Sequence, residues 1–136
     1  GPTVRAALDG LPPRDRERVV RALGGSLGAL HAAGMVHGDP TTSNFMVERL
    51  DGDAPAGLAM LDMSLGGRAE GVEERGVDLR LMSEAFGSTH HAHAGLWELV
   101  MEGYADAFPE GAGEAVRRME EIAARGRYVR REPGTR

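Results

Sequence analysis

Hydrophobic positions at helical spacing mark the first long element of the chain. Between residues 13 and 33, apolar side chains recur every three or four positions, while charged residues fill much of the opposite face. The apolar face consists of Val19, Val20, Leu23, Leu27 and Leu30, together with His31. Gly34 follows directly, and glycine often ends a helix because it adopts left-handed backbone without strain. We therefore predict a helix over about residues 13–33.

Two short apolar runs follow, at residues 45–47 and 58–61, and both have the length and composition of strands. Between them, Asp51-Gly52 is a dipeptide typical of tight turns, so we expect one β-hairpin. A glycine-rich, acidic stretch then leads to helices predicted over about residues 77–86, 94–108 and 113–125. The pattern predicts a mainly α protein with a small β-hairpin.

Composition narrows the class of protein. The chain has 136 residues, of which 41% are hydrophobic and 27% charged, as expected for one globular unit. We find no run approaching the roughly 18 apolar residues of a membrane span and no signal-peptide pattern, so we expect no membrane contact and a cytoplasmic location. The absence of cysteine excludes disulfides, a thiolate nucleophile and a zinc ribbon.

The charged residues are unevenly distributed. All 16 basic residues are arginine, so this chain by itself offers no lysine to a mechanism. Residues 125–136 carry five arginines and one glutamate, a charge of +4, which leaves −9 on the rest of a chain of net charge −5. A basic tail on an acidic body can contact nucleic acid, or it can be a solvated, frayed C-terminus.

The segment GMVHGDPTTSNFMV, residues 34–47, holds the candidate chemistry. Asp39 and Asn44 lie at the two ends of one polar loop, and we expect Asp62 to end the second strand of the hairpin. Phosphoryl transfer from a metal–nucleotide complex needs one carboxylate near the acceptor, and an amide oxygen with a second carboxylate to hold Mg²⁺. The alternative is a loop whose Asp and Asn only satisfy the backbone.

Three strings in the chain together resemble a known family. They are VHGDPTTSN, LDMSLG and VEERGVDLRLMSEAFGSTH, and they resemble the small atypical Ser/Thr kinase and ATPase of the KEOPS complex. That family works with the enzyme that makes threonylcarbamoyl-adenosine on tRNA. The resemblance covers nearly the whole chain, and it implies the C-terminal lobe of a protein-kinase-like fold over residues 1–136.

The resemblance implies a role for each residue of the loop region. Asp39 would be the catalytic aspartate, and Asn44 and Asp62 would bind the Mg²⁺ of ATP. Asp78 would be a buried helix carboxylate that accepts hydrogen bonds from the backbone of the catalytic loop. The residues that shape the loop would be His37, Thr41, Thr42 and Ser43.

The sequence departs from this family at several points. Pro40 replaces the usual Leu and disfavours the α region for the preceding residue, and Asp62-Met63-Ser64 replaces Asp-Phe-Gly. His91 follows STH in place of a proline. Such kinases also use a Gly-rich loop and a strand lysine, which this chain does not contain. We expect that N-terminal lobe to be lost, left out or on another polypeptide.

The implied activity is Mg-ATP-dependent protein phosphorylation or ATP hydrolysis. The implied partners are the tRNA-modifying catalytic subunit and the other KEOPS subunits. For tRNA, the candidate contacts are Arg125, Arg127, Arg130 and Arg131. Two alternatives stay open: a phosphotransferase acting on a small molecule such as an aminoglycoside or choline, and a non-catalytic module that binds a KEOPS partner and tRNA.

Histidines and aromatic residues in the C-terminal half offer further candidates. His90, His91 and His93 could suggest zinc, but of the three only His90 and His93 have a spacing that lets them face one another. No cysteine accompanies them, and an exposed turn between helices fits better. Trp97 and Tyr104 lie seven residues apart on one predicted helix face. They are either core residues or anchors of an interface.

Overall fold

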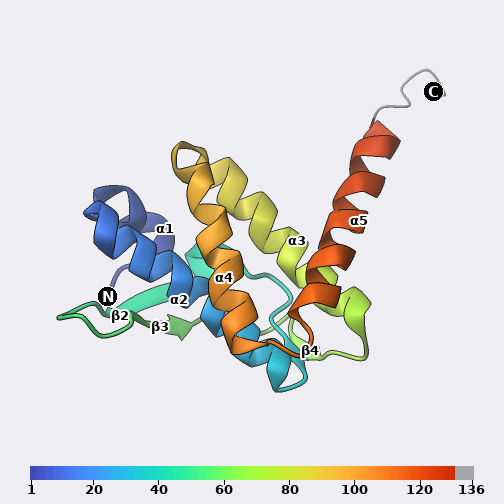
Figure 1. The fold of residues 1–136 in the computed structure, drawn as a ribbon, viewed down its shortest axis with the longest axis horizontal. Helices are drawn as coiled ribbons and strands as arrows, with labels where there is room; N and C mark the ends of the chain where they lie inside the picture. Colours follow the sequence, from blue (N-terminus) through green and yellow to red (C-terminus); the bar gives the residue numbers. More distant parts are fainter. Residues whose placement is uncertain (131–136) are drawn as a thin grey trace.

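The computed structural model describes residues 1–130, and Figure 1 shows a helical body with a small β-hairpin at one side. The four long helices are α2 (Pro13–Ala32), α3 (Val72–Thr89), α4 (Trp97–Ala107) and α5 (Ala112–Arg130). α2 packs mainly against α4, and α3 packs mainly against α5. The predicted mainly α fold with a β-hairpin is confirmed, and it is consistent with the C-terminal lobe of a kinase-like fold.

Helix α2 forms as its sequence predicts. Pro13 occupies the first helical position, where its missing N–H costs nothing, and Asp15 lies in the first turn, where a negative charge favours the helix dipole. The helix ends just before Gly34, whose φ of 85° is left-handed. Val19, Val20, Leu23, Leu27 and His31 on its predicted apolar face are all buried, whereas Leu30 is half-buried.

Glycines on two helices let α2 and α4 approach closely. A Cβ atom added to Gly24 would overlap the carbonyl oxygen of Val100 on α4, and one on Gly103 would overlap the carbonyl oxygen of Arg21 on α2. Side chains at these positions would push the helices apart. Gly24 in α2 and Gly103 in α4 therefore have a packing reason, although each lowers helix propensity.

The predicted starts and ends of the later helices need correction. α3 begins at Val72, not near residue 77. The glycines around its start hid this beginning in the sequence, but Glu73 and Glu74 stabilise the first turn of the helix. A short helix η3 (His91–Leu96) comes before α4, and α5 runs five residues beyond the predicted end. The chain also begins with two short helices that we did not predict, α1 (Val4–Ala7) and η1 (Leu8–Gly10).

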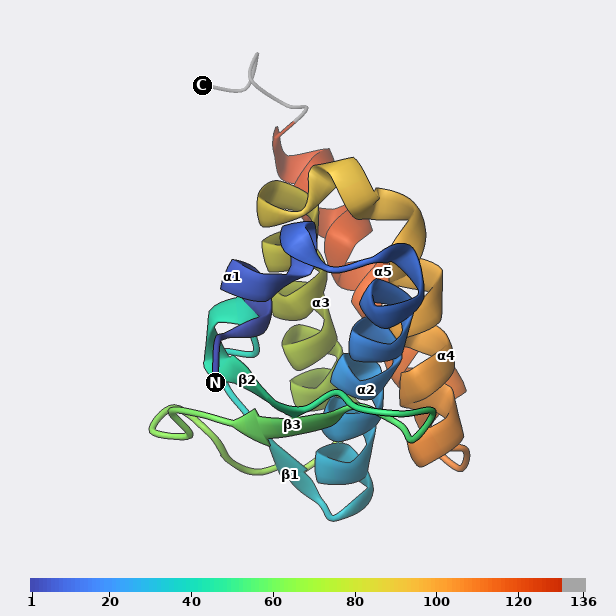
Figure 2. The ribbon, with the colours of Figure 1, turned by 90° about the vertical axis from the view of Figure 1, so that its left-hand side faces the viewer.

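The predicted hairpin is present as β2 (Phe45–Arg49) and β3 (Gly57–Met60), which lie across one side of the helices in Figure 2. They pair antiparallel with Phe45 opposite Met60. A second, unpredicted pair joins β1 (Met35–Val36) to β4 (Gly67–Arg68). A strand of two residues is too short to show the alternation of apolar and polar residues, so the sequence did not predict this pair.

The hydrophobic core is formed by the four long helices, the two short N-terminal helices and Phe45 of the hairpin. Its largest fully buried apolar side chains include Tyr104, Phe45, Phe86, Leu8, Leu23, Leu27, Leu79 and Met82. Trp97 is half-buried against this core, with its ring 5.8 Å from that of Phe86. Within residues 1–130, no helix combines the length and the apolar content needed to cross a membrane.

Candidate functional site

The polar loop of residues 37–44 runs from β1 to β2 and has near its start a glycine that no other residue can replace. Gly38 has a φ of 92°, and a Cβ atom there would overlap the carbonyl oxygen of Leu65. The segment around Leu65 therefore packs directly on the start of the loop. Both the backbone conformation and the available space require glycine next to Asp39.

Asp78 on α3 fixes the start of the loop from inside the protein. Its side chain is buried, with a relative exposure of 2%, and it accepts two backbone hydrogen bonds. The N–H of His37 donates to Oδ2 at 2.8 Å, and the N–H of Gly38 donates to Oδ1 at 2.9 Å. These are the contacts that the resemblance implies for Asp78, made across 40 residues of sequence.

Two further residues extend this network into the core. The imidazole of His31 lies with Nε2 2.8 Å from Asp78 Oδ2 and with Nδ1 2.6 Å from the hydroxyl oxygen of Tyr104. Because the carboxylate accepts, Nε2 carries a hydrogen, and in the neutral imidazole Nδ1 then accepts from the Tyr104 hydroxyl. Burial raises the pKa of Tyr104, so this hydroxyl keeps its proton.

The sequence placed His31 on the apolar face of α2 and left Tyr104 open between core and interface. The structure places both in the core, where they support Asp78. The one sequence signal was a histidine at a position where the periodicity demands an apolar residue.

The loop brings Asp39 and Asn44 together. Asn44 Nδ2 donates to the backbone oxygen of Asp39 at 2.8 Å, and it lies 3.3 Å from the carboxylate oxygen Oδ2 of the same residue. Two backbone bonds tighten the turn between them, from Thr41 N to Asp39 O and from Asn44 N to Thr41 O, both 2.9 Å. Pro40 is buried within this turn, so the fold accommodates the departure from the family's usual Leu.

His37 connects the loop to the end of the hairpin. Its Nε2 lies 2.7 Å from the carbonyl oxygen of Leu61, and its Nδ1 accepts from the N–H of Asp39 at 3.1 Å. Its ring stacks on Phe45 with the centroids 5.9 Å apart. Both ring nitrogens are engaged in structural contacts, which is what we expect of a residue that shapes the loop.

Asp62 lies two residues beyond the end of β3, not at the end of the strand as we expected. Its φ of 52° is left-handed, a conformation in which Asp is enriched. The carboxylate is exposed, and Ser64 Oγ donates to its Oδ1 at 2.7 Å. Hydrogen bonds from the side chain and then the backbone of Ser64 lower the pKa of Asp62, which favours the ionised form.

The hairpin sets Asn44 and Asp62 close together. The N–H of Leu61 donates to the carbonyl oxygen of Asn44 at 2.7 Å, which extends the ladder beyond β2 and β3. Asp62 is therefore one residue past a cross-strand partner of Asn44. Paired residues of antiparallel strands lie about 4.5–5.5 Å apart.

The donor set of Asn44 and Asp62 fits Mg²⁺. Asn44 uses its amide nitrogen toward Asp39, so its amide oxygen remains as a ligand, and Asp62 offers an exposed carboxylate. Among the residues that the structure describes, no three His, Cys, Asp or Glu side chains cluster as a metal site. Mg²⁺ that is carried by nucleotide phosphates commonly uses only one or two protein ligands.

The remaining predicted residues lie in different settings. Thr42 is buried, whereas Thr41 and Ser43 are half-buried in the loop. Arg125 lies 3.7 Å from the carboxylate of Glu73 on α3, and both Arg127 and Arg130 belong to the last turns of α5. The predicted tail therefore begins as a helix through residue 130, and Arg131 lies outside the described residues.

The predicted exposed histidine turn is correct only for His91, because His90 is buried and His93 is half-buried. His90 has a relative exposure of 1%, because it follows α3 directly and packs on Phe86. His91 is exposed, and His93 Nε2 lies 2.9 Å from the Asp9 carboxylate.

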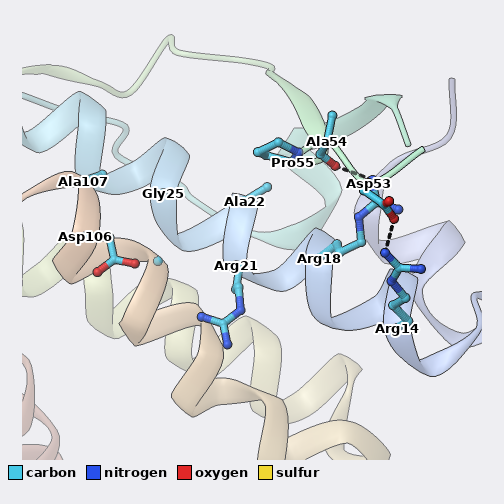
Figure 3. Close-up of a pocket in the computed structure, with 11 residues that line it drawn as sticks. Arg14, Arg18, Arg21, Ala22, Gly25, Asp53, Ala54, Pro55, Asp106 and Ala107 are labelled. Atoms are coloured by element: carbon cyan, nitrogen blue, oxygen red, sulfur yellow. Dashed lines mark hydrogen bonds and ion pairs between the residues drawn. The ribbon is translucent and has the colours of Figure 1, made fainter. Parts of the chain in front are cut away.

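A groove of about 520 Å³ lies elsewhere, between α2, α4 and the β2–β3 loop (Figure 3). Asp39, Asn44 and Asp62 are not among its lining residues. Arg14 forms an ion pair with Asp53, and Arg18 donates to the carbonyl oxygen of Ala54. Arg14 and Arg18 thus tie the hairpin loop to α2, which is a structural role.

Known proteins resemble this chain over most of its length. No family model matches it. It is 39% identical over 125 residues to the EKC/KEOPS complex subunit bud32 of Aspergillus oryzae, covering 84% of this chain and 46% of the relative. It is 36% identical over 137 residues to the KEOPS complex subunit Bud32 of Pyrococcus abyssi, covering 96% of the chain and 58% of the relative.

A third relative carries a name that includes the modified nucleoside. The chain is 41% identical over 110 residues to the probable bifunctional tRNA threonylcarbamoyladenosine biosynthesis protein of Methanoculleus marisnigri, covering 81% of this chain and 20% of that protein. The chain spans about half the length of the Bud32 relatives described above. On these similarities, the chain belongs to the Bud32 family of KEOPS complex subunits.

Proposed function

We propose that the protein containing this chain transfers a phosphoryl group from Mg-ATP, as an atypical Ser/Thr protein kinase or ATPase. We propose further that this activity supports threonylcarbamoyladenosine formation on tRNA within the KEOPS complex. One observation carries the chemical part: a single loop holds Asp39 beside Asn44, and the hairpin places Asp62 one residue past a partner of Asn44. The names of the relatives support the biological part.

The proposed roles follow from the geometry of the loop. Asp39 would receive the proton of the attacking hydroxyl or water, and the Asn44 amide, 3.3 Å from its carboxylate, would hold that carboxylate in one orientation. The amide oxygen of Asn44 and the Asp62 carboxylate would bind Mg²⁺. When bound, Mg-ATP supplies the phosphoryl group, and the metal neutralises charge on the phosphates.

Ser64 has a supporting role in this proposal. It stands where the family usually has glycine, and its hydroxyl donates to Asp62 Oδ1 at 2.7 Å. An aspartate is already ionised at neutral pH, and the lowered pKa of Asp62 extends this cation-binding form to more acidic pH. The second carboxylate oxygen would then face the metal, so the serine orients the ligand without replacing it.

The proposed partners are the tRNA-modifying catalytic subunit and other KEOPS subunits, in keeping with the relatives' names. We further propose that the arginines at the C-terminal end of the chain contact tRNA phosphates. Arg125 is drawn partly toward Glu73, so the contacts would come mainly from Arg127, Arg130 and Arg131. Each phosphate contact releases counterions, so binding should weaken steeply with salt.

The test is Mg²⁺-dependent hydrolysis of ATP by the full natural polypeptide that contains this chain. Asp39→Asn should reduce kcat by at least about 100-fold, since it removes the group that receives the proton. Asp106→Asn, an exposed carboxylate on α4, is the matched control and should leave hydrolysis unchanged.

Two outcomes would redirect the proposal. Hydrolysis that survives Asp39→Asn would remove the role of Asp39. Binding of Mg-ATP or of KEOPS partners without any hydrolysis would favour a non-catalytic module instead.

A further inference from the structure

A buried pair of polar side chains joins the middle of the loop to the end of α3. Thr42 Oγ1 lies 2.9 Å from His90 Nε2, and both residues have a relative exposure of 1%. Among the described residues, this is the one side-chain hydrogen bond formed by any of loop residues 40–43. The two positions lie 48 residues apart, in the strings TTSN and STH of the sequence.

His90 is itself held firmly in place. Its backbone N–H donates to the carbonyl oxygen of Phe86 at 2.8 Å and thereby completes the last turn of α3. Its carbonyl oxygen accepts from the N–H of His93, also at 2.8 Å. Its ring packs on Phe86 with the centroids 5.4 Å apart. Because both its backbone and its ring are fixed, His90 would stay in place if the loop moved. A displaced Thr42 would then lose its hydrogen bond to the imidazole.

The loop has three points of attachment, and His90 supplies the middle one. Asp78 holds the start, through the N–H groups of His37 and Gly38. The hairpin holds the end, through the bond between Asn44 and Leu61. Between these points, the short helix η2 (Thr42–Asn44) begins at the residue that His90 contacts. A displaced Thr42 would carry Asn44 with it and change its distance to Asp39.

We propose that His90 is a positioning residue that fixes the Asp39–Asn44 loop through its hydrogen bond to Thr42. The proposed catalytic and metal-binding residues do not include the STH string, and this contact gives the string a role. The importance of this anchor for phosphoryl transfer rests on the function proposed above. The anchor itself is a property of the loop and can be measured without nucleotide.

The neutral form of the imidazole suits this role. Nδ1 is buried and has no hydrogen-bond partner among the described residues, so protonation would add a charge and a donor where nothing accepts it. The charged groups that act on the ring from neighbouring elements are Arg5 on α1, Asp9 on η1 and His93 on η3. Only Asp9 favours the charged form, and burial outweighs it.

Amide hydrogen exchange, measured by NMR on the natural protein without ligand, tests the anchor. The N–H groups of Thr41 and Asn44 report on the loop, because both donate within it. Thr42→Val removes the hydroxyl at nearly constant volume, and we expect these two amides to exchange about fivefold faster, the effect of one neutral hydrogen bond. Thr42→Ser keeps a hydroxyl and should restore slow exchange.

Variants of His90 give the reciprocal test. His90→Leu removes both ring nitrogens and should accelerate the same two amides, whereas His90→Gln can place an amide group near the Nε2 position and should restore slow exchange. Combining His90→Leu with Thr42→Val should accelerate exchange no more than either change alone, because the two residues share one bond. His91→Leu, at the exposed neighbour, is the matched control and should leave exchange unchanged.

The possible results separate an anchor from a general effect on folding. Faster exchange of Thr41 and Asn44, with a constant rate at the core residue Leu23, supports the proposal. Equal acceleration at Leu23 would show a global loss of stability, and unchanged loop amides would show no anchor; either result overturns it.

ATP hydrolysis is followed in the same variants. His90→Leu should lower kcat with little change in KM, and His90→Gln should recover it. If the unaltered protein hydrolyses no ATP, the proposed function fails while the exchange data still decide on the anchor.

Discussion

Replacing Asp78 by asparagine probes the network beneath the loop most directly, because it changes one atom and keeps the volume. In the native protein three donors converge on this buried carboxylate: the N–H groups of His37 and Gly38 and Nε2–H of His31. The side-chain amide of the variant can present its oxygen at only one of the two oxygen positions. With the oxygen at the Oδ2 position, the bonds from His37 and His31 survive without charge, and the amide nitrogen faces the N–H of Gly38.

The expected loss of stability follows from this count. One charge-assisted hydrogen bond, worth about 1.5–3 kcal/mol, is lost, and one buried donor is left facing another donor. The two remaining bonds weaken because they no longer end on a charge. We therefore expect the free energy of unfolding to fall by about 2–4 kcal/mol, a large part of the about 5–15 kcal/mol that is typical of a domain.

Urea unfolding measures this change, with the fluorescence of Trp97, the single tryptophan among these 136 residues, as the probe. Trp97 packs against Phe86 in the core and should respond to global unfolding. For a urea m-value of about 2 kcal/mol per molar, the middle of the typical range, the midpoint should fall by about 1–2 M. Asp106→Asn on the surface of α4 should stay within about 0.5 kcal/mol of the unaltered protein. A similarly small change for Asp78→Asn would refute the buried network.

Three further predictions concern packing and charge. In urea unfolding, Gly24→Ala should destabilise the fold by about 1–3 kcal/mol, because the new methyl group overlaps the backbone of α4. Gly25→Ala is the control, and it should be neutral or stabilising because its Cβ would lie 3.8 Å from the nearest atom. Burial lowers the pKa of His90, so the unfolded chain binds a proton on this ring more readily than the folded protein does. The stability contributed by the neutral ring is therefore complete above the ordinary histidine pKa of about 6.5 and falls as the pH drops below it. Unfolding at several pH values measures this fall, and its absence would show that the ring titrates normally. Ser64→Ala should raise the pKa of Asp62 toward its ordinary value, measured by carbon NMR of the carboxyl group, and an unchanged pKa would show that the serine bond is absent in solution.

The sequence predicts those parts of the fold whose pattern is long and local. The apolar face of α2 and its end at Gly34 follow from periodicity and one glycine, and the hairpin follows from two apolar runs around a turn. The start of α3 was missed because the stretch before residue 77 is rich in glycine, although Glu73 stabilises its first turn. The pairing of β1 with β4 depends on contacts between distant segments, which periodicity cannot reveal.

The same distinction applies to the site. Asp39, Asn44 and Asp62 could be proposed as site residues from the sequence because their spacing along the chain is itself the signal. The support around them was only partly foreseen. Tyr104 reaches the network through a hydrogen bond spanning 73 residues, and His90, expected to be exposed, is instead buried against Thr42. The only local signal of either contact is the histidine at an apolar position of α2, because both contacts depend on how helices pack in three dimensions.

The central claim is that the loop and the hairpin together form a binding site for metal-bound nucleotide. Binding of Mn²⁺ with ATP tests it directly, because the paramagnetic ion broadens NMR signals of nearby groups. The account predicts selective broadening of the Asn44 side-chain amide and of the backbone amides of Asp39 and Asp62, while the amide of Asp106 on α4 stays sharp. Broadening at Asp106 with sharp signals at Asn44 and Asp62 would contradict the account.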